Sequence, residues 1–275
     1  MSVLSLQGLI VSRGGPGWAG PTISLQASRE MIDRAFKPAR LQAVVLNINS
    51  PGGSPVQSDL VASYIRGKAE QRNVPVIAFV EDMAVSGGYW LACAGDRIYA
   101  ARSSVVGSIG VINQGLGFHQ LIEKVGIERR TITAGENKSK LDPFAPLQQK
   151  DVQLMEGLLR EVHQHFMDQV RASRGKRLVG GDDVLFNGDF WTGEPAVKLG
   201  LIDGIDTAEA FIQREWAGQV ELVRVKARAG LAAKLSSMLD RTRPLVGAAQ
   251  EEGALRLSPM TLDPRIAEIV HRFLR

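Results

Sequence analysis

Ser86 lies where the sequence could expose a nucleophile. The apolar run 76–80 precedes it, Gly87 and Gly88 follow it, and the helix-compatible segment YWLACA comes next. This order predicts a tight turn from a strand into a helix, with unpaired amides at the helix N-terminus. A serine hydroxyl at such a turn suits covalent catalysis, because donors already point at a developing oxyanion. The alternative is that Ser86 only caps a core helix, and this stretch alone leaves both interpretations open.

The elements around Ser86 alternate between apolar strands and helices. We expect strands over 3–11, 41–48, 75–80 and 97–101, and helices over 23–36, 55–71 and 86–94. This order indicates an α/β fold of parallel βαβ units with right-handed crossovers. Active groups in such folds collect at the carboxyl ends of the strands. The turns Ser50-Pro51-Gly52-Gly53 and Ser86-Gly87-Gly88 should therefore be neighbours in space.

The second half of the chain is expected to be more helical. The pattern predicts an extended segment over 103–112, a short helix over 117–125, a strand over 127–133 and a long amphipathic helix over 147–174. Short helices over 180–184 and 192–200, a turn at 201–206, a helix over 207–216 and a last strand over 220–225 follow. Residues 1–225 are predicted to form one domain and residues 226–275 a C-terminal helical extension.

Composition narrows the function. Of 275 residues, 44% are hydrophobic, the formal net charge is +4, and no basic and aromatic cluster indicates nucleic-acid binding. Cys93, the only cysteine, lies in an apolar run and is expected in the core; no Cys/His spacing suggests a metal site. We expect no cofactor. No leader or membrane-spanning segment is seen, so we expect a cytoplasmic location, with peripheral contact at the inner membrane as an alternative.

The other candidate side chains have ordinary explanations. His163 and His165 lie two residues apart on the long helix and are interpreted as solvated polar residues. His119 is expected at the surface. Glu81 and Asp82 precede the serine and are interpreted as surface charges at a strand end.

Four segments together resemble a known family. INSPGG, the segment from Ser86 through GGYWLACAGDRIYA, VGSIGVI and GENKSKLDPF resemble, in order and spacing, the signal peptide peptidase A family of serine proteases, family S49. The resemblance runs over about 3–203. It implies a crotonase-like α/β fold, related to the Clp protease subunit, and a Ser–Lys dyad in place of Ser–His–Asp.

The resemblance assigns roles by position. Ser86 matches the nucleophile and Lys138 the general base, with Lys140 as the competing candidate. Ser108 matches the serine that hydrogen-bonds the lysine amine. Gly53 and the amide of Gly87 match the oxyanion hole.

The dyad has a clear chemical requirement. A lysine acts as a base near neutral pH only if its pKa falls well below about 10.4, and burial has that effect. Neutral Lys138 would take the Ser86 proton, an acyl-enzyme would form, and Lys138 would return the proton to the leaving amine. Without the family pattern, Lys138 would be interpreted as a solvated loop lysine.

The expected function is therefore that of a serine endopeptidase acting on signal-peptide-like or other small or apolar peptides. The alternatives are an acyl-CoA hydratase or isomerase and a non-catalytic oligomeric scaffold on the same fold. The resemblance also implies a homo-oligomer, such as a tetramer or octamer, in which subunits can share one site. Two helices are expected in 226–275. The first, over 226–241, could be a basic amphipathic helix that packs on its own subunit or contacts a membrane surface or a partner.

Overall fold

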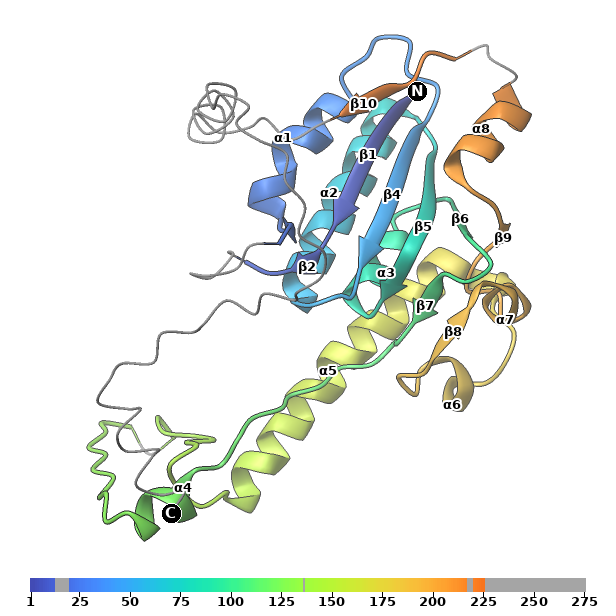
Figure 1. The fold of residues 1–275 in the computed structure, drawn as a ribbon. Helices are drawn as coiled ribbons and strands as arrows, with labels where there is room; N and C mark the ends of the chain where they lie inside the picture. The colour runs from blue at the N-terminus through green and yellow to red at the C-terminus, as the bar shows by residue number, and fades with distance from the viewer. Residues whose placement is uncertain (13–19, 136, 217–219, 226–275) are drawn as a thin grey trace, which may run out of the picture. The chain divides into compact units, whose positions relative to one another are not determined.

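The computed structural model describes residues 1–12, 20–135, 137–216 and 220–225 (Figure 1). The predicted helical extension over 226–275 lies outside these residues, as does Glu136, two positions before Lys138.

An eight-stranded sheet is the centre of the described chain (Figure 1). Its strands are β1 (Ser2–Gln7), β4 (Val44–Ser50), β5 (Val76–Val85), β6 (Arg97–Ala100), β7 (Val105–Gly107), β8 (Phe190–Thr192), β9 (Gly204–Ile205) and β10 (Val223–Val225). The main path runs β10-β1-β4-β5-β6-β9, and its neighbours are all parallel. β7 pairs in parallel with β5 beyond the end of β6, and β8 pairs antiparallel with β7. The short strands β2 (Leu9–Ile10) and β3 (Thr22–Ile23) form a separate parallel pair.

Helices connect and cover the strands. They are α1 (Leu25–Ala35), α2 (Pro55–Arg72), α3 (Gly87–Ala92), α4 (His119–Lys124), α5 (Gln149–Arg174), α6 (Asp182–Leu185), α7 (Gly193–Lys198) and α8 (Ala208–Trp216), with a 3-10 turn at Gly175–Arg177. The strand–helix alternation predicted for the first hundred residues is confirmed, with ends shifted by a few positions.

The pleat of β4 explains the layers. Val44, Leu46 and Ile48 join one core cluster with residues of α1, α2 and α3, whereas Val45 joins a second cluster with Phe211 of α8. Successive side chains of a strand point to opposite faces, so an unbroken apolar run needs cover on both. The sheet is therefore buried on both faces, as the apolar run 41–48 predicted.

The C-terminal half of α5 attaches this helix to the core. Phe166 stacks on Trp90 of α3 with ring centroids 4.8 Å apart. Arg174 is fully buried and donates two hydrogen bonds to Asp203, at 2.8 and 3.0 Å, and one to the Gly200 carbonyl at 2.9 Å. The long predicted helix is thus confirmed, and its last turns are fixed by an aromatic stack and a buried ion pair.

Some predictions about the second half are wrong. Residues 127–133 form no strand; Ile132 is fully exposed and no strand pairs with this segment among the described residues. Apolar β-branched composition favours a strand only where a neighbouring strand supplies hydrogen bonds. Conversely, the predicted turn at 201–206 contains β9, which extends the sheet beside β6. Only Val105–Gly107 of the predicted extended segment 103–112 is a strand.

Candidate active site

Ser86 joins β5 to α3 in a strained backbone conformation. Its φ is 52° and its ψ is −126°, a region that residues with a side chain seldom adopt. Its amide donates to the Gly107 carbonyl at 2.8 Å, and its carbonyl accepts the first bonds of α3 from the Tyr89 and Trp90 amides. The side chain makes no capping hydrogen bond to the helix. The N-cap explanation of this serine therefore lacks its defining contact.

The second glycine turn lies directly against the serine. A Cβ atom built on Gly52 would lie 2.8 Å from Ser86 Cβ and 2.9 Å from the Gly87 nitrogen. One built on Gly87 would lie 3.4 Å from the Gly53 nitrogen. The expected proximity of the two turns is confirmed.

Two amides are unengaged where these turns meet. Neither the Gly53 nor the Gly87 amide donates a hydrogen bond to another residue of the described chain. Unpaired backbone donors beside a serine hydroxyl are the geometry that stabilises a developing oxyanion. The role assigned to these amides stays a prediction.

Contacts with β2 hold the Gly53 turn in place. Ile10 donates from its amide to the Gly52 carbonyl, and its own carbonyl accepts from the Ser54 amide, both at 2.8 Å. Gly53 has φ 139°, and a Cβ atom there would lie 2.1 Å from the Ile10 oxygen. Only glycine fits so close to this strand.

Ser108 directly follows β7, as Ser86 directly follows β5. The β5–β7 register pairs Val85 with Gly107, so Ser86 and Ser108 are the next positions of two parallel strands. Ser108 also has φ 52°, and its amide donates to the Asp189 carbonyl at 2.7 Å. The structure thus brings together Ser86, Ser108 and the two glycine amides.

Lys138 is not part of this group in the single chain. It is exposed, and its amide donates to the Gly135 carbonyl at 3.2 Å. Two residues later, Lys140 Nζ contacts Asp151 Oδ1 at 3.0 Å in the first turn of α5. Asp151 precedes Phe166, which stacks on α3, by fifteen positions, or about 22 Å of helix. The lysine segment therefore lies near the opposite end of α5 from Ser86.

The competing lysine is already engaged. Asp151 is buried, accepts from Lys140 and from the Leu141 amide, and its pKa is held below the ordinary carboxyl value chiefly by Lys140. Lys140 Nζ therefore already has a buried carboxylate as its partner. This geometry favours Lys138 over Lys140.

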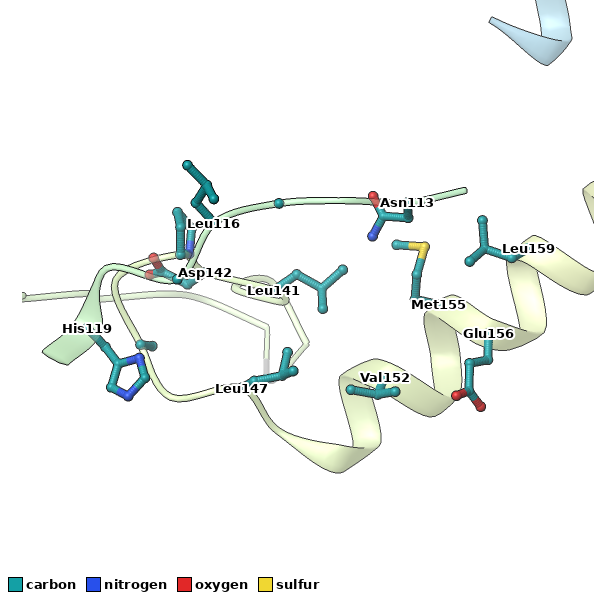
Figure 2. A pocket seen from close by; sticks show the side chains of 14 residues that line it. Asn113, Leu116, His119, Leu141, Asp142, Leu147, Val152, Met155, Glu156 and Leu159 are labelled. Atoms are coloured by element: carbon teal, nitrogen blue, oxygen red, sulfur yellow. The ribbon is translucent and has the colours of Figure 1, made fainter. Parts of the chain in front are cut away.

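A cavity of about 430 Å³ lies beside the lysine segment (Figure 2). Its walls come from the stretch before α4, the segment after Lys138 and the first turns of α5. Figure 2 shows apolar side chains along both sides, including Leu141, Leu147 and Val152. His119 and Glu156 are among its polar members. His119, expected at the surface, is half-buried here.

A second histidine also differs from its sequence interpretation. His163, predicted to be solvated, is half-buried, and its Nε2 is 3.1 Å from the Ile109 carbonyl oxygen, one residue after Ser108. His165 is exposed, as predicted. Helical periodicity gives the relative directions of two histidines but not which of them meets another element.

The remaining candidate side chains are either buried or hydrogen-bonded to other residues. Cys93 is buried, and burial raises the pKa of its thiol to about 12, so it is not a thiolate at neutral pH. Glu81 accepts from Gln7 at 3.1 Å, and Asp82 accepts from Asn49 at 2.5 Å. Among the described residues no group of three or more His, Cys, Asp or Glu could hold a metal ion.

A sequence model of peptidase family S49 matches residues 68–221, more than half of the chain. The chain belongs to peptidase family S49. Its parallel sheet covered on both faces is the crotonase- and Clp-protease-like α/β fold that the resemblance implied. The family match includes Ser86, Ser108 and Lys138, but not the Gly53 turn.

Two curated relatives with protease names agree with this membership. The chain is 33% identical over 187 residues, 68% of its length, to 27% of the chloroplastic serine protease SPPA of Arabidopsis thaliana. It is 30% identical over 203 residues, 74% of its length, to 56% of the probable protease SohB of Haemophilus influenzae. A Brucella abortus protein named Na(+)/H(+) antiporter NhaA is 43% identical over 229 residues, which cover 83% of this chain but 31% of that protein.

The chain spans less than two thirds of the length of each of these relatives. The antiporter's name cannot be transferred on a match to under a third of that protein. In the described part of the chain, no helix combines the length and the apolar character needed to cross a bilayer.

Proposed function

We propose that this S49 family member is a serine endopeptidase that works through a Ser86–Lys138 dyad. The observation that carries the proposal is the junction at Ser86. There a strained serine, a second serine directly after β7 and two unengaged amides lie at the carboxyl ends of β4, β5 and β7. Peptide-bond hydrolysis uses each of these parts.

The mechanism assigns each part a step. Neutral Lys138 takes the proton of Ser86 Oγ as this oxygen attacks the scissile carbonyl carbon. The carbonyl oxygen becomes an oxyanion, which accepts hydrogen bonds from the Gly53 and Gly87 amides. The C–N bond then breaks, Lys138 gives the proton to the leaving amine, and an acyl-Ser86 ester remains. Water, deprotonated by Lys138, hydrolyses the ester, while Ser108 orients the lysine amine.

The position of Lys138 favours a site shared between copies of the chain. Lys138 is at the far end of α5 from the Ser86 of its own chain. We therefore expect it to act on the Ser86 of a neighbouring subunit. Large apolar side chains near it support an interface, because buried subunit contacts are apolar. Ile132 is fully exposed, and Leu116 is 73% exposed. We therefore propose a homo-oligomer, such as a tetramer or octamer, as the active form.

The proposed substrates are peptides with small or apolar residues before the scissile bond, as in signal peptides. The apolar cavity beside the lysine segment supports this preference. Cleavage-site mapping by mass spectrometry on a peptide library tests it, and a strong preference for basic residues before the cut would contradict it.

A fluorophosphonate probe tests the nucleophile. We expect one adduct per chain, mapped to Ser86 by tandem mass spectrometry, and strongly reduced labelling in Lys138→Ala. Lys140→Ala is the matched control and should keep most of the labelling. Labelling elsewhere, or equal labelling of the Lys138 variant, would overturn the dyad. Calorimetry with an acyl-CoA tests the hydratase or isomerase alternative. That chemistry needs a pair of acid/base carboxylates, and the two described carboxylates shortly before Ser86, Glu81 and Asp82, each accept a hydrogen bond from another side chain.

A further inference from the structure

His163 contacts the segment that carries Ser108. Its ring lies on α5, and Nε2 donates to the Ile109 carbonyl across 3.1 Å. Ile109 is fully buried, and no other described residue donates to this carbonyl. A buried carbonyl without a hydrogen-bond donor destabilises the folded state, so this contact favours the conformation in which the turn packs on the helix.

The turn needs such support. Ser108 has φ 52°, which is unfavourable for a residue with a Cβ atom. Its amide is held by the Asp189 carbonyl at 2.7 Å, and its carbonyl accepts from the Gly110 amide at 3.0 Å. His163 adds the only side-chain hydrogen bond to this turn among the described residues. It thereby limits where the Ser108 hydroxyl can point.

The same face of α5 also contacts the helix behind Ser86. Phe166, three residues after His163, stacks on Trp90 of α3. Between Asp151 and Phe166 no residue of α5 is buried. His163 and Phe166 therefore mark where α5 leaves the core, and they fix this helix to both sides of the Ser86–Ser108 pair.

We infer that His163 is a positioning residue that fixes Ser108 through the Ile109 carbonyl. It does not touch the substrate and transfers no proton. Ser108 in turn orients the amine of the base lysine, so displacement of the turn changes the rate and the ionisation of that lysine. This inference rests on the proposed Ser–Lys mechanism.

The test compares His163→Leu, which removes the donor, with His163→Gln, whose amide nitrogen can reach a similar position. Small displacements near reacting groups cost about ten- to a hundredfold in rate. We expect His163→Leu to lower kcat on a peptide substrate by about tenfold with little change in KM. The lysine-dependent limb of the pH–kcat profile should move in the same direction as in Ser108→Ala. His163→Gln should recover most of kcat, and His165→Leu should behave like the native protein.

A double variant separates positioning from general damage. Ser108→Ala with His163→Leu should be no slower than Ser108→Ala alone, since both changes disable one function. The inference would be overturned if the double variant lost kcat by the product of the two single-variant factors. A native kcat and pH profile in His163→Leu would also overturn it. If His163→Leu does not fold, His163→Gln and the shorter His163→Asn are compared, and equal kcat and pH profiles for these two would overturn it. Retained turnover in Ser86→Ala would instead refute the proposed function itself.

Discussion

Ser86 and Ser108 directly follow Val85 and Gly107, the last paired residues of two parallel strands, and both have φ 52°. One hydrogen bond, from the Ser86 amide to the Gly107 carbonyl at 2.8 Å, links their turns directly. Left-handed backbone at a residue with a side chain costs roughly 1–2 kcal/mol and persists where the surroundings impose it. Two such residues side by side indicate a site whose geometry is kept at the expense of stability.

Replacement of Ser86 should separate activity from backbone strain. We expect Ser86→Ala and Ser86→Gly to abolish peptidase activity with the fold intact. Ser86→Gly should be the more stable of the two by about 1 kcal/mol, because glycine adopts this φ without a Cβ penalty. Peptide turnover and thermal unfolding measure both effects. Full turnover by Ser86→Ala would eliminate the serine mechanism.

Gly87→Ala should damage the oxyanion site through a specific clash. The added Cβ would clash with the buried Ser58 Oγ, so either this hydroxyl leaves the Ser54 carbonyl or α3 shifts relative to the Gly53 turn. Loss of one oxyanion donor typically costs about a hundredfold or more in kcat. The second change Ser58→Ala removes the clashing oxygen and should restore part of kcat. A double variant no faster than Gly87→Ala would show that this clash is not the cause.

Mixed oligomers should recover activity if subunits share a site. Ser86→Ala and Lys138→Ala are each expected to be inactive, but a mixture contains interfaces with one intact serine and one intact lysine. Random mixing of equal amounts should restore about a quarter of the native sites. The two variants are mixed under conditions that exchange subunits, and turnover is measured before and after. No recovery in oligomers shown to have exchanged would place the complete dyad in one chain.

The Lys140–Asp151 ion pair should stabilise the protein only where Asp151 is ionised. Lys140 holds the pKa of Asp151 below the usual value of about 4, so the native state favours the carboxylate. This contribution is present above the usual pKa and is lost as pH falls through the lowered value. Asp151→Asn should therefore unfold more easily than the native protein at pH 7, with a smaller difference near pH 3. Urea titrations at both pH values check this, and a difference that does not change with pH would contradict it.

Arg174→Met should be strongly destabilising. It removes the bidentate partner of Asp203 and leaves the Gly200 carbonyl without its donor. Breaking a buried pair on one side typically costs about 3–5 kcal/mol, and the remaining contact of Asp203 with Arg177 at 3.2 Å favours the lower end. Arg160→Met, on an exposed arginine of the same helix with a surface ion pair to Glu156, is the control and should cost under about 1 kcal/mol. Equal urea midpoints for the two variants would show that burial is not decisive here.

The first half of the fold was predictable because its apolar strand patterns agree with the way the strands and helices pack in the structure. Apolar runs such as 41–48 have helices on both sides in sequence, so strand, crossover and burial all follow from one pattern. The contact between the two glycine turns followed from the rule for carboxyl ends of parallel strands.

The second half depends on partners that are distant in sequence. Residues 127–133 have strand-like composition but no neighbouring strand, whereas Gly204–Ile205 resembles a turn and pairs with β6. The contact of His163 with Ile109 spans 54 positions, and no local pattern indicates it. Sequence spacing also does not show that Lys138 lies away from its own Ser86. The lysine segment contacts the first turn of α5, whereas a later part of this helix contacts α3.

Burial of Cys93 has a practical consequence for studying this protein. The chain has a single cysteine, whose inaccessible thiol with a pKa of about 12 will not react with maleimides or methanethiosulfonates in the folded state. The native sequence is therefore already a background for site-directed labelling. A cysteine placed at the fully exposed Ile132 would carry a spin label or a fluorophore next to the lysine segment, and distances between labels would report how copies of the chain assemble.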